Sequence, residues 1–163
     1  MTRAVTAYVG LGSNLDDPER QVRAALAALD RLPGTSLTAA SSLYRNPPMG
    51  PQDQPDYVNA VARLSTVLEP VALLDGLLGI EQRQGRRRGR RWGERILDLD
   101  LLLWGEREMA HERLTLPHPG LHERAFVLYP LAELSPALRV PGHGPVAVLC
   151  TRVDGSGLRR LPD

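Results

Sequence analysis

Residues 96–104 read Ile-Leu-Asp-Leu-Asp-Leu-Leu-Leu-Trp, which is the clearest strand pattern in the chain. Alternate side chains of a strand share one face. The apolar face is then expected to consist of Leu97, Leu99, Leu101 and Leu103. Asp98 and Asp100 should lie together on the other face, about 6.5 Å apart along the strand at roughly 3.3 Å per residue.

Two neighbouring carboxylates repel each other, so a strand this apolar is expected to carry both only where a cation compensates their charge. The spacing of Asp98 and Asp100 suits two Mg²⁺ ions about 3.5–4 Å apart, bridged by carboxylates and phosphates. The alternative is that the second face of the strand is merely solvated and that the aspartates serve solubility.

The pattern outside this strand predicts the order strand–helix–strand–strand–helix–strand, with additions at the C-terminal end. Asp17 and Pro18 suit the start of a helix, and Pro70 suits the start of another. The expected elements are strands at 4–10, 36–45, 57–67 and 96–104, helices at 18–32 and from 70, a short strand at 108–111 and a helical segment at 121–134. This order predicts an α+β fold with the ferredoxin-like βαββαβ arrangement, in which helices pack on an antiparallel sheet, followed by a C-terminal extension.

Length and composition limit the number of domains, the kinds of partner and the cellular location that can be expected for this chain. The chain has 163 residues without an evident linker or repeat, which predicts a single domain over 1–163. Its net charge of +1 gives no reason to expect a nucleic-acid or membrane partner, and we expect a monomer. The single cysteine excludes an internal disulfide, the apolar runs are too short to span a bilayer, and the absence of a leader pattern predicts a cytoplasmic protein.

An arginine-rich segment directly precedes the aspartate strand. Residues 83–95 contain seven Arg, with glycines at 85, 89 and 93. Guanidinium groups suit phosphate oxygens, and glycines allow a loop to fold over a ligand, so residues 84–95 are expected to be a mobile lid. Trp92 could stack on a flat ring. The alternatives are a solvated loop, a nucleic-acid patch and an ordinary surface tryptophan.

Four segments resemble, in the same order, the 6-hydroxymethyl-7,8-dihydropterin pyrophosphokinase family. They are residues 10–15 (GLGSNL), 44–59 (YRNPPMGPQDQPDYVN), 91–102 (RWGERILDLDLL) and 113–119 (RLTLPHP), the last followed by Arg124 and Phe126. The resemblance implies transfer of the terminal diphosphate of ATP to the hydroxymethyl group of the pterin, which leaves AMP, with two Mg²⁺ ions. The substrates would be small molecules. Either Asp100 accepts the hydroxyl proton, or a metal lowers the pKa of the hydroxyl.

The resemblance also implies a role for individual residues. Asp98 and Asp100 would hold both Mg²⁺ ions and count, with Arg86 and Arg95, as catalytic. The catalytic loop would include Arg86, Arg88, Trp92 and Arg95, with Arg86 and Arg95 binding phosphates. The ATP site would include Glu81, Arg113, Thr115, His118 and Arg124. The pterin pocket would include Asn46, Pro47, Met49, Tyr57, Asn59 and Phe126.

Three of these features of the sequence, Glu81, His118 and residues 10–14, can also be interpreted without the resemblance. Glu81 falls on the apolar stripe of its helix, where a carboxylate needs a partner. The alternative is a boundary residue paired with Arg. His118 lies between prolines and alone is typical of an ordinary loop histidine. Residues 10–14 do not match GxGxxG, so we expect the strand to end at Gly10 and a tight turn to follow beside the pocket.

Other classes of protein explain less of the sequence. An RNA-binding module would need aromatic residues on its central strands, but only 4% of the residues are aromatic. A metal-dependent nucleotidyltransferase would use the two aspartates but leaves the proline-rich segment 46–51 unexplained. An interaction domain with a basic loop explains neither the two aspartates nor the proline-rich segment.

Overall fold

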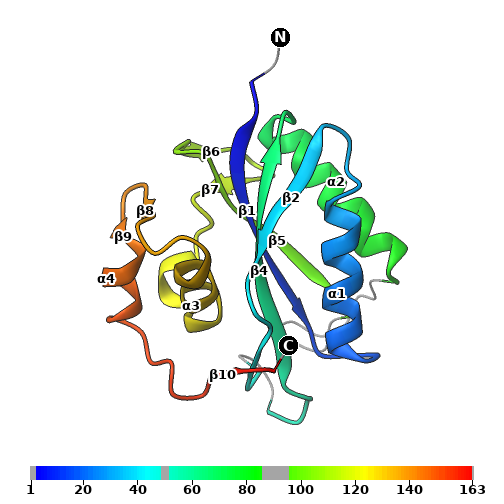
Figure 1. Ribbon diagram of the computed structural model, residues 1–163, viewed down its shortest axis with the longest axis vertical. Helices are drawn as coiled ribbons and strands as arrows, with labels where there is room; N and C mark the ends of the chain where they lie inside the picture. The colour runs from blue at the N-terminus through cyan, green and yellow to red at the C-terminus, as the bar shows by residue number, and fades with distance from the viewer. Residues whose placement is uncertain (1–2, 49–51, 86–95, 163) are drawn as a thin grey trace.

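A six-stranded antiparallel sheet forms the centre of the fold (Figure 1). The computed structural model describes residues 3–48, 52–85 and 96–162. The sheet order is β10-β3-β4-β1-β5, and β2 pairs with β4 next to β3. The strands of this sheet are β1 (Val5–Ser13), β2 (Thr35–Ala40), β3 (Tyr44–Asn46), β4 (Tyr57–Thr66), β5 (Asp98–Trp104) and β10 (Arg159–Arg160). Two small hairpins lie outside it, formed by β6 (Met109–Ala110) with β7 (Thr115–Leu116) and by β8 (Arg139–Val140) with β9 (Gly144–Pro145).

Helices cover both faces of the sheet. Figure 1 shows α1 and α2 on one side and α3 and α4 on the other. The helices are α1 (Pro18–Leu29), α2 (Pro70–Arg83), the 3₁₀ helix η1 (Leu121–Glu123), α3 (Ala125–Leu134) and α4 (Val146–Cys150). An antiparallel sheet with helices packed on it is therefore confirmed. None of the helices in the described ranges has the length and hydropathy that crossing a bilayer would take.

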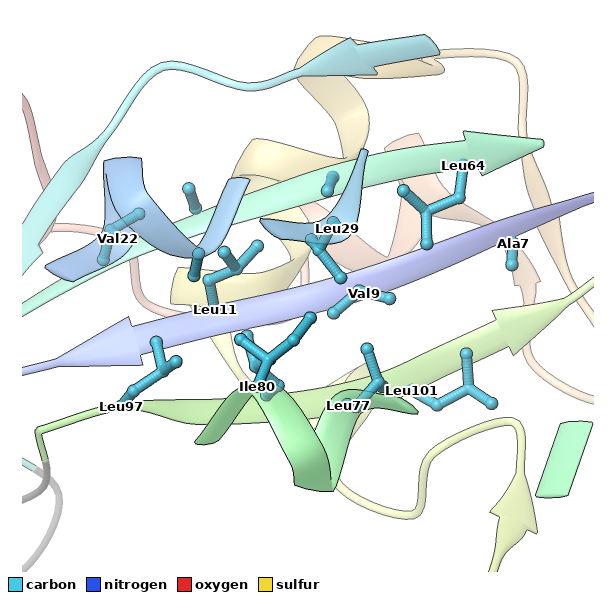
Figure 2. Close-up of a cluster of buried hydrophobic side chains, with 14 of the residues drawn as sticks. Ala7, Val9, Leu11, Val22, Leu29, Leu64, Leu77, Ile80, Leu97 and Leu101 are labelled. Atoms are coloured by element: carbon cyan, nitrogen blue, oxygen red, sulfur yellow. The ribbon is translucent and has the colours of Figure 1, made fainter. Parts of the chain in front are cut away.

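The larger core lies between the sheet and the pair α1 and α2. Val22 and Leu29 of α1 and Leu77 and Ile80 of α2 belong to one buried cluster with Val9 and Leu11 of β1 (Figure 2). Their spacing along each helix gives one apolar stripe, and burying each such side chain contributes about 1.5–3 kcal/mol. Both helices start with proline at the first turn, as expected, and Asp17 precedes α1 without a capping hydrogen bond from its side chain.

The expected turn at residues 10–14 is wrong, because β1 continues to Ser13. Hydrogen-bonded neighbours on both sides keep this glycine-containing stretch extended: Gly12 is in register with Asn59 of β4 and with Asp98 of β5. The chain turns later, at Asp16 and Asp17, whose φ angles are 53° and 63°.

The single strand expected at 36–45 is divided into β2 and β3. At the break, the Ser41 side-chain oxygen accepts the Val61 backbone N–H at 2.9 Å, while the Ser41 N–H donates to the Val61 carbonyl. Because a side chain takes the place of a backbone acceptor there, the ladder with β4 is interrupted without leaving the Val61 N–H unpaired.

The alternation expected along β5 is correct from Leu97 to Leu101 and wrong at Leu103. Val9 pairs with Leu101 and Tyr8 with Leu103, so the register shifts between them. A bulge adds one residue to a strand and reverses the faces beyond it. Leu103 therefore packs with the α3-side cluster, and Trp104 packs against the α1/α2 core in its place.

Candidate functional site

The two aspartates and Asn59 lie on the same face of the sheet, on strands either side of β1. In antiparallel pairs, residues in register place their side chains on the same face. Gly12 is in register with both Asn59 and Asp98, and Gly10 with Asp100. Because both intervening residues of β1 are glycines, no β1 side chain stands between the amide and the carboxylates.

Gly12 also allows Asn59 to lie close to the β1 backbone. A Cβ at position 12 would lie 2.8 Å from the Asn59 Oδ1 atom, which is closer than packed atoms allow. Any side chain at position 12 would thus displace Asn59. This role of Gly12 was not predicted from the sequence, although the Gly-x-Gly spacing on a strand was the available signal.

Asn46, Tyr57 and Asn59 meet where β3 pairs with β4. Asn46 is in register with Tyr57, and the Asn59 Nδ2 donates to the Asn46 Oδ1. The Asn46 Nδ2 donates to the Pro47 carbonyl at 3.0 Å. Both asparagines are buried, at 8% and 5% exposure. Four of the expected pocket residues therefore come together from two strands and the loop that follows β3.

His118 lies beside Asp100. Its backbone N–H donates to the Leu102 carbonyl at 3.0 Å, and its Nε2 is 3.8 Å from the Asp100 Oδ1. Its Nδ1 accepts the Gly120 N–H, so the proton of the neutral ring is on Nε2. Burial lowers the pKa of His118, Asp100 opposes this, and Arg124 lowers the pKa further. The nitrogen of the neutral imidazole that lies nearest the carboxylate is therefore the protonated one, and at 3.8 Å the two atoms are too far apart for a direct hydrogen bond.

Glu81 fixes the start of the strand that carries both aspartates. It lies on α2 with 3% exposure, and its Oε2 accepts the backbone N–H of Leu99 at 2.7 Å. Leu99 lies between Asp98 and Asp100 on β5, the last strand of the sheet order. The sequence predicted that Glu81 needs a partner, and this backbone donor is one that periodicity could not identify.

The remaining residues of the expected ATP site lie around β5. Arg113 lies between β6 and β7 and forms an ion pair with Asp75 of α2. Thr115 is exposed on β7, and β7 packs beside β5. The Arg124 guanidinium lies 5.9 Å from the centre of the Phe126 ring at the start of α3. The expected site residues outside the described ranges are Met49, Arg86, Arg88, Trp92 and Arg95; the lid expected at 84–95 falls almost wholly outside them too.

A buried amide pair connects the end of β1 to the segment before β4. The Asn14 Nδ2 donates to the Gln54 Oε1 at 3.0 Å and to the Pro55 carbonyl at 2.9 Å. Asn14 is 1% exposed and Gln54 is 6% exposed. Both residues belong to segments that carried the family resemblance, but neither was predicted as a site residue. They position the start of β4, and with it Tyr57.

A second polar cluster holds β3 against α3. Glu133 accepts hydrogen bonds from the Ser42 N–H and hydroxyl at 3.0 Å and from the Tyr44 hydroxyl at 2.5 Å. Burial and the neighbouring carboxylate raise the pKa of Tyr44 to about 12. Burial alone would raise the pKa of Glu133, but the hydrogen bonds from Tyr44 and Ser42 lower it below its ordinary value of 4.5.

Glu133→Gln is expected to reduce the free energy of unfolding at neutral pH by about 1 kcal/mol, because solvent screens this partly exposed cluster. The folded-state pKa of Glu133 is lowered, so its contribution is present above pH 4.5 and is lost as the pH falls through the folded-state pKa. Urea unfolding of both proteins from pH 7 downward should show the difference shrinking below pH 4.5. Glu112→Gln, at an exposed position, is the control and should give no such difference. A difference for Glu133→Gln that is independent of pH would contradict the assignment.

Comparison with known proteins gives consistent matches. A family model described as 7,8-dihydro-6-hydroxymethylpterin-pyrophosphokinase matches residues 8–136. The 2-amino-4-hydroxy-6-hydroxymethyldihydropteridine pyrophosphokinase of Haemophilus influenzae is 55% identical over 137 residues, covering 84% of this chain and 86% of that protein. The enzyme of the same name from Pseudomonas aeruginosa is 52% identical over 155 residues, covering 95% and 96%. A folic acid synthesis protein of Schizosaccharomyces pombe is 38% identical over 159 residues, which are 97% of this chain and 22% of that protein.

Solved structures share the fold. The wild-type HPPK-DHPS of Plasmodium falciparum with pteroate has a TM-score of 0.74 at 12% identity, covering 93% of this chain and 43% of that chain. The same protein with pterin and p-hydroxybenzoate has a TM-score of 0.72 at 14% identity, again covering 93% and 43%. At these identities the likeness concerns the fold alone, and this chain spans less than half of those chains.

Proposed function

The chain belongs to the 7,8-dihydro-6-hydroxymethylpterin-pyrophosphokinase family, and we propose that it transfers the terminal diphosphate of ATP to the hydroxymethyl group of 6-hydroxymethyl-7,8-dihydropterin. The products are AMP and the pterin diphosphate, in folate biosynthesis. The observation that carries the proposal is the shared sheet face on which Asn59 and Asp98 lie either side of Gly12. The side-chain amide that would bind a heteroaromatic ring and the carboxylates that would bind metal-bound phosphates are thus separated only by strand β1.

Asp98 and Asp100 would hold Mg²⁺, with two ions expected. The donors fit, because Mg²⁺ usually binds one or two carboxylates and completes its shell with substrate phosphates and water. The described residues contain no group of three or more His, Cys, Asp or Glu able to hold a metal, so phosphate oxygens would supply the other ligands. When bound, Mg²⁺ neutralises phosphate charge and keeps the diphosphate aligned for transfer.

The pterin would lie over Gly12, with its polar edge toward Asn46 and Asn59. Each side-chain amide offers an acceptor oxygen and donor hydrogens, which match a ring edge that alternates donors and acceptors. Tyr57 and Phe126 would lie around the ring faces, and Pro47 and Met49 would complete the wall. The buried position of both asparagines supports this assignment, since a buried amide discriminates strongly against a ligand that leaves it unpaired.

The transfer step needs positioning and charge stabilisation more than covalent chemistry. The hydroxymethyl oxygen attacks the β-phosphorus of ATP, and the bond from that phosphorus to the oxygen bridging the α-phosphate breaks. AMP leaves with that oxygen, and the hydroxyl proton passes to Asp100 or to water. Arg86 and Arg95 would bind the phosphates. The nucleotide would be held by Glu81, Arg88, Trp92, Arg113, Thr115, His118 and Arg124.

We also assign the ferredoxin-like arrangement to the core of the sheet. In support, β1 and β4 form the central antiparallel pair, with β5 outside β1 and β2 and β3 outside β4. Both crossover helices, α1 and α2, pack on one face. A single domain over 1–163, a monomeric state and a cytoplasmic location stay predictions from the sequence.

Product analysis tests the activity directly. The purified chain, incubated with ATP, Mg²⁺ and 6-hydroxymethyl-7,8-dihydropterin, should form AMP and a pterin diphosphate in equal amounts. Formation of ADP with a pterin monophosphate would refute a diphosphate transfer, and absence of any pterin product would refute the substrate assignment.

Asn59→Ala is expected to weaken pterin binding by about 1–3 kcal/mol, because it leaves polar groups of the ring without a partner. Calorimetry with pterin and a non-hydrolysable ATP analogue measures this loss, and ATP-analogue affinity without pterin should hardly change. Ser65→Ala, on the same face of β4 at its other end, is the matched control and should alter neither affinity. If Asn59→Ala weakened only the binding of the ATP analogue, the assignment of the pterin pocket and the nucleotide pocket would have to be reversed.

A further inference from the structure

The C-terminal tail, residues 154–162, lies outside the residues matched by the family model, which end at 136. The tail nevertheless returns to the sheet and forms its edge strand, β10, against β3 (Figure 1). Arg160 is in register with Tyr44, and the Leu161 N–H donates to the Leu43 carbonyl at 2.8 Å. The three-residue strand β3 is therefore paired on both edges, by β4 and by the tail.

The tail also contacts the wall of the pocket. A Cβ added at Gly157 would lie 3.3 Å from the Pro47 Cδ atom, so the tail backbone lies directly against this proline. At its start, the tail backbone at Gly155 lies against the Tyr129 ring of α3, where there is no room for a Cβ. The Arg160 guanidinium lies 3.7 Å from Glu133, the carboxylate that binds Tyr44.

A strand as short as β3 has few ladder bonds of its own, and such segments open locally at low cost in free energy. Pairing at the second edge raises that cost. The residues that β3 presents to the site are at its end: Asn46 binds Asn59, and Pro47 follows. Anything that fixes β3 therefore fixes the amide pair and the proline wall.

We propose that the C-terminal tail is a positioning element of the substrate site, which sets the affinity for the pterin by holding β3 and Pro47 in place. This inference rests on the proposed function. It also predicts which half of the site, the pterin half or the nucleotide half, changes when the tail is altered. In the sheet order β10-β3-β4-β1-β5, the tail and the aspartate strand are at opposite edges, so the tail should affect the pterin and leave the nucleotide half unchanged.

Leu161→Pro in the full chain removes the N–H that donates to Leu43. The loss of about one hydrogen bond should raise the KM for the pterin about fivefold, with kcat and the KM for ATP within about twofold of the original values. Hydrogen exchange without ligands should become faster at the β3 amides. Leu161→Ala keeps the donor and should largely restore the pterin KM and the slow exchange.

Gly157→Val is a second test that leaves the ladder intact. Its side chain would push on Pro47 and should also raise the pterin KM, whereas Ser156→Val places the same side chain at the exposed neighbouring position and should not. Equal changes in both KM values, or a fall in kcat with both KM values unchanged, would mean a general folding role and would overturn the proposal. Unchanged β3 exchange in Leu161→Pro would overturn it as well. If the original protein made no pterin product, the proposed function would fail, and with it the role of the tail in substrate binding. Faster hydrogen exchange at the β3 amides in Leu161→Pro would still show that the tail holds β3 in place.

Discussion

Asp98→Asn and Asp100→Asn should each lower kcat/KM by about 100-fold or more, while the protein stays folded. An amide keeps the shape of the side chain but carries no charge, and loss of one charged group that acts on the transferring phosphates typically costs that much. Stability should not fall, because each substitution removes repulsion between two carboxylates on one strand face. The Asp100 side chain is 46% exposed, so little buried surface depends on it.

AMP formation under saturating Mg²⁺ measures the loss, and circular dichroism and thermal unfolding test the fold. Asp30→Asn is the matched control: this exposed aspartate accepts the Leu37 N–H at 2.8 Å, and the amide oxygen of Asn can still accept it. Leu37 is in register with Leu64, which pairs with Ala7 near the other end of β1 from Gly12. Full activity in either Asp98→Asn or Asp100→Asn would refute the metal assignment.

Glu81→Ala should lower both stability and activity. It leaves the Leu99 N–H buried without this acceptor, which costs about 1–3 kcal/mol of unfolding free energy. The freed strand would also misplace both aspartates, and errors of about 1 Å in such a site reduce turnover up to about 100-fold. We therefore expect kcat/KM to fall by about 10- to 100-fold, with hydrogen exchange at Leu99 becoming faster.

Glu81→Gln separates anchoring from direct contact with the nucleotide. Its amide oxygen can still accept the Leu99 N–H, so it should recover most of the stability and of kcat. Glu69→Ala is the control, because its carboxylate is exposed and pairs with Arg107 at the surface, and it should change stability by less than about 1 kcal/mol. A Glu81→Gln protein that is fully stable but has a strongly raised KM for ATP would show that Glu81 serves the nucleotide itself, as the family resemblance implied.

The sequence alone predicted the parts of this protein that depend on local geometry. The two-residue period of a strand placed Asp98 and Asp100 on one face, and proline preferences located the starts of α1 and α2. The order of four short motifs identified the family, because those motifs are linear. Each of these inferences uses residues that are neighbours along the chain, so no knowledge of the tertiary structure was needed.

Only the tertiary structure decided which distant segments meet. The bulge in β5 depends on how it pairs with β1, and it moved Leu103 to the α3 side against expectation. The register of β1 placed Gly12 between Asn59 and Asp98, where a turn had been expected. Likewise, the Leu99 N–H reaches Glu81, and the tail reaches Pro47, only through packing. The physical reason is that pairing register and edge contacts arise from hydrogen bonds and packing between segments far apart in sequence, which local periodicity does not encode.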